Sequence, residues 1–106
     1  MIVRFALYHG ILPDADRSAF DDHVQTRMVP LISSFPGLQS VRIMVPSESD
    51  GRLAGALLAL EMTYPDRAAM DRALASPERV QNAEETKGLL AMLSDPQVSH
   101  TVFEVT

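Results

Sequence analysis

Apolar residues recur every three or four positions between residues 18 and 38, and this is the strongest pattern in the chain. Their spacing matches one face of an α-helix, formed by Phe20, Val24, Met28, Leu31, Ile32 and Phe35. Asp16 or Ser18 can cap the start of this helix, and Pro36-Gly37 follows its end. Because Pro30 lacks an N–H and its ring clashes with the preceding turn, we expect a kink or a break at Val29.

The rest of the chain contains four apolar runs typical of strands, at residues 2–8, 38–45, 53–63 and 98–105. The third run is rich in alanine, so a helix is an open alternative there. Asp50-Gly51 marks a hairpin loop, and Pro65-Asp66 and Ser76-Pro77 begin helical segments, the last reaching about residue 93. The order β-α-β-β-α-β predicts one ferredoxin-like α+β domain over residues 1–106, with a four-stranded antiparallel sheet in the order 4-1-3-2.

Side chains alternate between the two faces of each strand, so each strand can be divided by parity. In the first strand Val3, Phe5 and Leu7 form a wholly apolar set, which we assign to the side under the helices. The opposite face then carries a mixed set: Arg4, Ala6, Tyr8, Arg42, Met44, Leu57, Glu61, His100, Val102 and Glu104. This face is too apolar for water, so we expect a second copy of the chain to pack on it and enclose a partly polar cavity.

Composition narrows the classes of partner. The chain has 106 residues, 46% of them hydrophobic, which is enough for a real core. A net charge of −5 argues against nucleic acid as a partner, and the apolar runs are too short for a membrane span or a signal peptide. Zero cysteines exclude disulfides, thiolate metal sites and cysteine catalysis, and fit a cytoplasmic location.

Several short motifs resemble the EthD family of the dimeric α+β barrel superfamily. They are Phe20, Val29-Pro30-Leu31, Phe35-Pro36-Gly37-Leu38, Thr63-Tyr64-Pro65-Asp66 and Ala73-Leu74-Ala75-Ser76-Pro77-Glu78, and together they cover nearly the whole chain. The resemblance implies two ferredoxin-like subunits packed sheet to sheet, with a pocket in each. Relatives by fold include antibiotic-biosynthesis monooxygenases, muconolactone isomerases and some polyketide cyclases, so cofactor-independent monooxygenase-, isomerase- or cyclase-like chemistry is implied.

One departure from the family concerns the long helix. EthD-like sequences commonly carry a histidine two residues before the helix proline, and Met28 occupies that position here. Chemistry assigned to that histidine therefore does not carry over. Whether Met28 or the nearby His23 takes over a role in contacting a ligand is left open by the sequence.

The best candidate for chemistry is the pair Tyr8 and His100. The end of the first strand lies beside the start of the last, and parity puts both side chains on one face. A histidine and a tyrosine in a dry pocket can act as base and hydrogen-bond donor on a phenol, enol or carbonyl. We expect burial to lower the pKa of His100. The alternative interpretation is a hydrogen-bonded pair at the mouth of a dimer core.

Several other residues are weaker candidates for a functional role. Arg42, Met44 and Leu57 are candidate substrate contacts on the same face as Tyr8. Arg4 is expected between Glu61 and Glu104, more as an interfacial ion pair than as a substrate anchor. His9 and His23 lack a third ligand, so no metal site is expected, and without a Gly-rich phosphate loop or dinucleotide fingerprint no cofactor is expected either.

Two functions follow from these observations. The first is binding or transformation, without cofactor, of a small and largely apolar oxygenated metabolite, such as a phenol, lactone or enolisable ketone, in catabolism or secondary metabolism. The alternative is a non-enzymatic dimeric binding or accessory protein, which the missing helix histidine favours. An open pocket with Tyr8 and His100 converging favours the first, and a closed dimer core favours the second.

Overall fold

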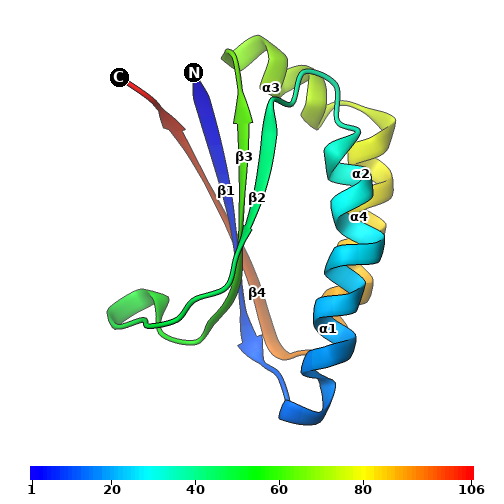
Figure 1. Cartoon of the computed structure of the whole chain (residues 1–106), viewed down its shortest axis with the longest axis vertical. Helices are drawn as coiled ribbons and strands as arrows, with labels where there is room; N and C mark the ends of the chain where they lie inside the picture. The colour runs from blue at the N-terminus through cyan, green and yellow to red at the C-terminus, as the bar shows by residue number, and fades with distance from the viewer.

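One antiparallel sheet, covered by helices on a single side, makes up the architecture (Figure 1). The structure is a computed structural model that describes residues 1–106 apart from the side chain of Arg52. The strands are β1 Ile2–Ile11, β2 Ser40–Met44, β3 Ala56–Tyr64 and β4 Ser94–Glu104, in the spatial order β2-β3-β1-β4. All three strand pairs are antiparallel, so the predicted ferredoxin-like topology is confirmed.

The long amphipathic helix is continuous but contains one wide turn. After the short 3₁₀ turn η1 (Asp14–Asp16), the chain runs through α1 (Arg17–His23), the π-helical η2 (Val24–Met28) and α2 (Val29–Ser33). The N–H of Val29 donates to the carbonyl of Val24, five residues back, directly before Pro30. This wider turn accommodates a proline that has no N–H of its own, so the expected break at Val29 does not occur.

The other two helices on this side of the sheet begin at the predicted caps. The Asp66 carboxylate accepts a hydrogen bond of 2.8 Å from the N–H of Ala69 at the start of α3 (Arg67–Leu74). The Ser76 hydroxyl accepts one of 3.3 Å from the N–H of Arg79 at the start of α4 (Pro77–Leu90). Two boundaries differ from expectation: a 3₁₀ turn, η3 (Gly51–Leu53), delays β3, and β4 begins four residues before residue 98.

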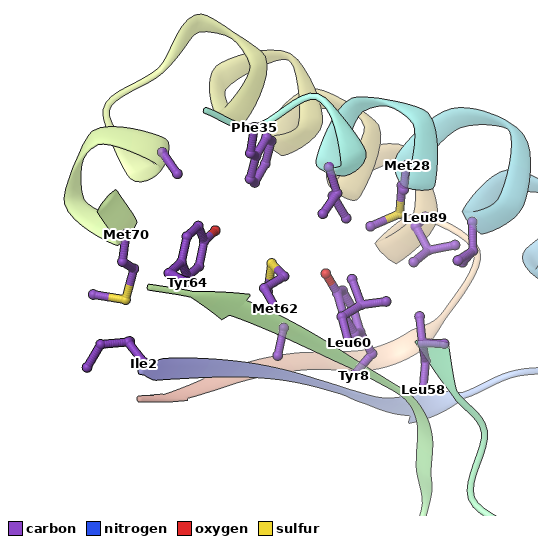
Figure 2. Packing of buried hydrophobic residues seen from close by; sticks show 14 of the residues in the cluster. Ile2, Tyr8, Met28, Phe35, Leu58, Leu60, Met62, Tyr64, Met70 and Leu89 are labelled. Carbon is purple, nitrogen blue, oxygen red and sulfur yellow. The ribbon is translucent and has the colours of Figure 1, made fainter. Parts of the chain in front are cut away.

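The core fills the space between the sheet and the helices (Figure 2). Five of the six residues predicted on the inner face of the long helix are buried, and only Leu31 is half-buried. From the sheet, alternate residues of β3 point into the same space, namely Leu58, Leu60, Met62 and Tyr64. Gly37, in the turn that follows α2, has φ +75°, and a Cβ atom there would lie 3.1 Å from the Cβ of Ala69, so both conformation and space favour glycine.

The predicted faces are wrong for β1 and β4 and correct for β2 and β3. Ile2, Ala6 and Tyr8 are only 5%, 2% and 3% exposed and belong to the core under the helices. Ala6 pairs with Leu60 on one side and with His100 on the other, which puts His100 on this helix-facing side as well. The apolar set of β1 and the residues paired with it on β4 therefore lie on the other side, which we call the outer face: Val3, Phe5, Leu7, Thr101 and Phe103.

The error has a physical cause. An apolar stripe identifies the covered side of a strand only when the other side meets water, and both sides of β1 are mainly apolar, with Arg4 on the helix-facing side. On the outer face Phe5 and Phe103 pack edge to face with ring centroids 5.5 Å apart, while Phe103 remains 49% exposed. Arg4 can occupy the helix-facing side because it lines a cavity there and is only half-buried.

Candidate functional site

A cavity of about 240 Å³ lies between the sheet and the helices α2 and α4. The sheet contributes Arg4, Ala6, Tyr8, Leu60, Met62, Val98 and His100 to its lining. The helical layer contributes Ile32, Phe35, Arg79, Asn82, Ala83, Thr86 and Leu90. The predicted pocket is therefore inside one subunit, beneath the helices, and does not lie between two sheets as the parity argument had placed it.

Small side chains on opposite walls create this space. Ala6 lies at the centre of the sheet, between Leu60 and His100 in the paired strands, and Ala83 lies on the facing side of α4. A methyl group at each position leaves a gap that larger residues elsewhere in the core fill. The walls are otherwise mainly aliphatic and aromatic, which suits a small ligand with an apolar body.

Tyr8 and His100 meet at this cavity, as the sequence predicts. Tyr8 is opposite Val98 and His100 is opposite Ala6, so the two candidates are diagonal neighbours across β1 and β4. Diagonal neighbours on one face are separated by roughly 7–8 Å, close enough for both side chains to contact one small molecule. Figure 2 shows the Tyr8 ring rising from the sheet toward the helices, into the layer that holds the cavity.

The phenol of Tyr8 is held in its protonated form. Burial raises the pKa of Tyr8, and the Thr86 hydroxyl and the charge of Arg4 act more weakly in the opposite direction. Thr86, which also lines the cavity, donates its own proton to the backbone carbonyl of Asn82 at 2.9 Å, so its oxygen is left as an acceptor. Tyr8 can therefore act as a neutral hydrogen-bond donor at any physiological pH.

His100 is held in its neutral form. Burial lowers its pKa, and the charges of Arg4 and Arg79 lower it further. The direction expected from the sequence is thus confirmed, while the part played by the two arginines was not foreseen. A neutral imidazole on the edge strand β4 can accept a proton from a molecule in the cavity.

Arg4 does not form the expected ion pair. Glu61 lies opposite Phe5 on the outer face, and its carboxylate accepts two hydrogen bonds from Arg42, at 2.8 and 2.9 Å. Hydrogen bonding to Arg42 is the main reason that the pKa of Glu61 is lowered. Arg4 and Glu61 lie on opposite faces of the sheet, because Glu61 is opposite Phe5 and not Arg4. Arg4 lines the cavity instead.

The remaining candidate residues lie away from this cavity. Arg42 is paired with Glu61, and strand alternation puts Met44 and Leu57 on the same outer face as that pair. Met28 is 0% exposed and packs in the core without lining the cavity. None of these four residues lines the cavity that contains Tyr8 and His100. Parity had grouped three of them with that pair, namely Arg42, Met44 and Leu57.

The histidines outside the cavity have other neighbours. His23 Nε2 lies 2.7 Å from the backbone carbonyl oxygen of Glu85 and 3.5 Å from its carboxylate. His9 lies at the far end of β1, beside Gln97 of β4. Among the described residues, no group of three or more histidine, aspartate or glutamate side chains could hold a metal ion together.

Sequence reasoning missed the contribution of α4. Its residues at positions 79, 82, 83, 86 and 90 share one face and all line the cavity, and three of them are polar: Arg79, Asn82 and Thr86. A core helix normally presents large apolar residues there. The sequence does contain a pattern that indicates this: one face of α4 has no large apolar residue in its first turns. The same pattern is also typical of a helix that faces solvent.

Comparison with known proteins gives a likeness at the level of the fold. No protein-family model and no curated protein matches the sequence. None of the described helices has the length and apolar content needed to cross a membrane. Solved structures do match: a member of the ethyl tert-butyl ether D (EthD) family from Bacillus halodurans superposes with a TM-score of 0.77 at 22% identity, over 100% of both chains.

Two further structures show the range of proteins with this fold. A dimeric ferredoxin-like protein of unknown function from Bacteroides fragilis has a TM-score of 0.72 at 10% identity, over 98% of this chain and 95% of its own. A cofactor-independent oxygenase from Streptomyces nogalater has a TM-score of 0.66 at 14% identity, over 99% and 92%. The chain therefore has the ferredoxin-like α+β fold of EthD-like proteins.

Proposed function

We propose that the protein binds and transforms a small, largely apolar oxygenated molecule in the cavity between β1, β4 and α4, without a cofactor. The observation that carries this proposal is the convergence of Tyr8 and His100 on one cavity of about 240 Å³. At slightly below the 300–1,000 Å³ common for ligand pockets, this volume suits a ligand of one or two rings. The similarity to a cofactor-independent oxygenase and an EthD family protein supports this class of chemistry.

The two side chains have complementary roles in this proposal. Neutral His100 accepts a proton from a phenol, an enol or the carbon beside a ketone. The Tyr8 phenol donates a hydrogen bond to the ligand oxygen on which negative charge develops. The pKa of each group is shifted away from the range in which its role would be lost, since His100 stays unprotonated and Tyr8 stays protonated.

A non-enzymatic binding protein is the second candidate. It is favoured by Met28, which is fully buried in packing where EthD-like sequences commonly have a histidine. Both candidates use the same cavity, and they differ in whether the bound molecule is changed.

We also propose that two copies associate through the outer face. Val3, Phe5 and Leu7 on β1 and Phe103 on β4 form an apolar strip that the helices do not cover. Similar proteins from Bacteroides fragilis and Jannaschia are described as dimeric. The cavity lies on the opposite side of the sheet, so such a dimer leaves each site within its own subunit.

Proton exchange tests the proposed chemistry directly. The probe is 2-indanone in D₂O, whose α-protons exchange for deuterium when a base removes them, followed by ¹H NMR. We expect the wild type to accelerate exchange and His100→Gln to lose most of the acceleration. Bound 2-indanone that exchanges no faster than in buffer would favour the binding protein.

A pair of α4 variants tests whether the probe binds in the cavity. Ala83→Leu puts a larger side chain on the cavity wall, whereas Val80→Leu changes a position that is 63% exposed. Leucine has a high helix propensity, so both variants are expected to fold. Binding should fall in Ala83→Leu and persist in Val80→Leu; equal binding by the two variants would contradict the proposed site.

A further inference from the structure

Two arginines face the cavity without a carboxylate partner. Arg4 enters from β1 and Arg79 from α4, and no aspartate or glutamate is among the lining residues. Within the described side chains, the ion pairs are Arg17–Asp21, His23–Glu85, Arg42–Glu61 and Lys87–Glu84, and none of them includes Arg4 or Arg79.

This local charge opposes the charge of the whole protein. The chain has 14 acidic residues and only 9 lysines and arginines. Carboxylates are therefore numerous enough to pair with every arginine. Glu61 on β3 is turned to the outer face and paired there with Arg42, and Glu104 on β4, which shares the helix-facing side with Arg4, forms no ion pair with it. Neither carboxylate pairs with Arg4, so the two guanidinium groups share the lining of one cavity that has no acidic side chain.

The pairing of like charges is unfavourable in the free protein. Burial lowers the pKa of Arg4, and the charge of Arg79 lowers it further, yet guanidinium groups remain protonated at physiological pH. A half-buried cation needs a compensating charge or hydrogen bonds. An anionic oxygen between Arg4 and Arg79 would provide both, because guanidinium N–H groups bind carboxylates and similar oxyanions strongly.

A third polar group in the cavity is also without a protein partner. Asn82 lies one helical turn after Arg79, and its Oδ1 is buried with no hydrogen-bond donor among the described residues. A buried amide oxygen normally has such a partner. Because it lines the same cavity as the two arginines, it can accept a hydrogen bond from a hydroxyl group on a ligand.

We infer that the ligand is a small organic anion with an apolar body, whose negatively charged oxygen binds Arg4 and Arg79 and whose hydroxyl group binds Asn82. The inference rests on the proposed function and adds the charge of the ligand to it. A carboxylate and an ionised phenol or enol share the required oxygen. In either case the arginines bind the charged oxygen of the ligand, and Tyr8 and His100 contact another part of it.

Matched neutral and anionic probes test the charge. Benzoate and benzamide have nearly the same shape, and their binding can be followed by ¹H–¹⁵N NMR through the amides of Ala6, Ala83 and Leu90. We expect benzoate to bind roughly tenfold or more tightly, the ratio expected for one charge-assisted contact. Its affinity should fall as salt is added. A second arm compares ionised 4-nitrophenol with nitrobenzene, and separates a phenolate from a carboxylate preference.

Variants connect the preference to the named residues. Arg79→Gln and Arg4→Gln should each remove most of the preference for benzoate over benzamide, while Arg67→Gln, exposed on α3, should preserve it. Salicylate, which adds a hydroxyl, should bind more tightly than benzoate to the wild type but not to Asn82→Ala. The comparison within the wild type remains decisive even if an arginine variant fails to fold.

The outcomes separate this inference from the proposed function. If neutral and anionic probes bind the cavity equally, the inferred ligand charge is wrong and the proposed function stands. If no probe shifts the amides that line the cavity, both are wrong. If benzoate or the nitrophenolate binds preferentially and Arg79→Gln abolishes the preference, the anionic ligand class is supported.

Discussion

Tyr64 offers a direct test of how the core beneath the helices is built. It ends β3, is 0% exposed, and its hydroxyl has no hydrogen-bond partner among the described residues. Figure 2 shows its ring between Met62 and Met70, with the hydroxyl directed toward the helical layer. Tyr64→Phe keeps the ring and removes only the hydroxyl, so the variant isolates the free energy of burying that one polar group.

The expected magnitude follows from the missing partner. Burying a hydroxyl without a hydrogen bond costs about 1–3 kcal/mol. Replacing it should therefore raise the free energy of unfolding by about 1 kcal/mol or more. In a domain of this size each kcal/mol shifts the melting temperature by roughly 4–8 °C. Tyr8→Phe is the matched control, since its hydroxyl faces Thr86 and its removal should instead cost about 0.5–1.5 kcal/mol.

The pH dependence gives a second signature. Burial raises the pKa of Tyr64 above its ordinary value, which is about 10. The folded state therefore disfavours the phenolate, so stability is unaffected by this group below about pH 10 and is lost as pH rises through the folded pKa. The stability advantage of Tyr64→Phe over the wild type should consequently widen in alkaline solution.

Urea denaturation at a fixed protein concentration measures these differences, with the m-value checked for constancy between variants. A loss of 1 kcal/mol or more in Tyr64→Phe, at an unchanged m-value, would refute the reasoning. It would mean that the hydroxyl makes a hydrogen bond that stabilises the fold.

Three further predictions concern the dimer, the cavity and the long helix. Phe103→Asp should give monomers or aggregates by light scattering, because it puts a charge into the proposed interface; Val80→Asp is the exposed control, and a stable Phe103→Asp dimer would show that the outer face is not the interface. Arg79→Gln should raise the pKa of His100 in an NMR titration without restoring its ordinary value, since burial, the largest cause, remains. The lowered pKa of His100 contributes stability that is present above about pH 6.5 and is lost as pH falls through the folded pKa. This loss of stability in acid should be smaller in Arg79→Gln. An unchanged pKa of His100 in Arg79→Gln would contradict the shared cavity. Met28→Leu should cost less than about 1.5 kcal/mol and leave benzoate binding intact, and selective loss of binding would contradict its role in packing.

The sequence by itself determined the topology. Hydrophobic periodicity identified the long helix, and caps such as Asp66 and Ser76 located the starts of the next two, because these signals depend only on neighbours along the chain. The order of elements then left few possible sheets, and the predicted strand order is the observed one. Parity across paired strands also predicted correctly that Tyr8 and His100 share one face.

Only the tertiary structure decided which side of β1 the helices cover. The wholly apolar set lies on the outer face and the set that contains Arg4 lies under the helices, so the contrast in the pattern indicated the wrong side. Arg4 was accordingly assigned to an ion pair on the wrong face. The cavity is lined by Ala6 in the sheet and by Ala83 on α4, two positions whose separation no local pattern encodes. Arg79 and Asn82 acquire their significance in the same way, because a polar stripe on a helix indicates a site only once the surface that it faces is known.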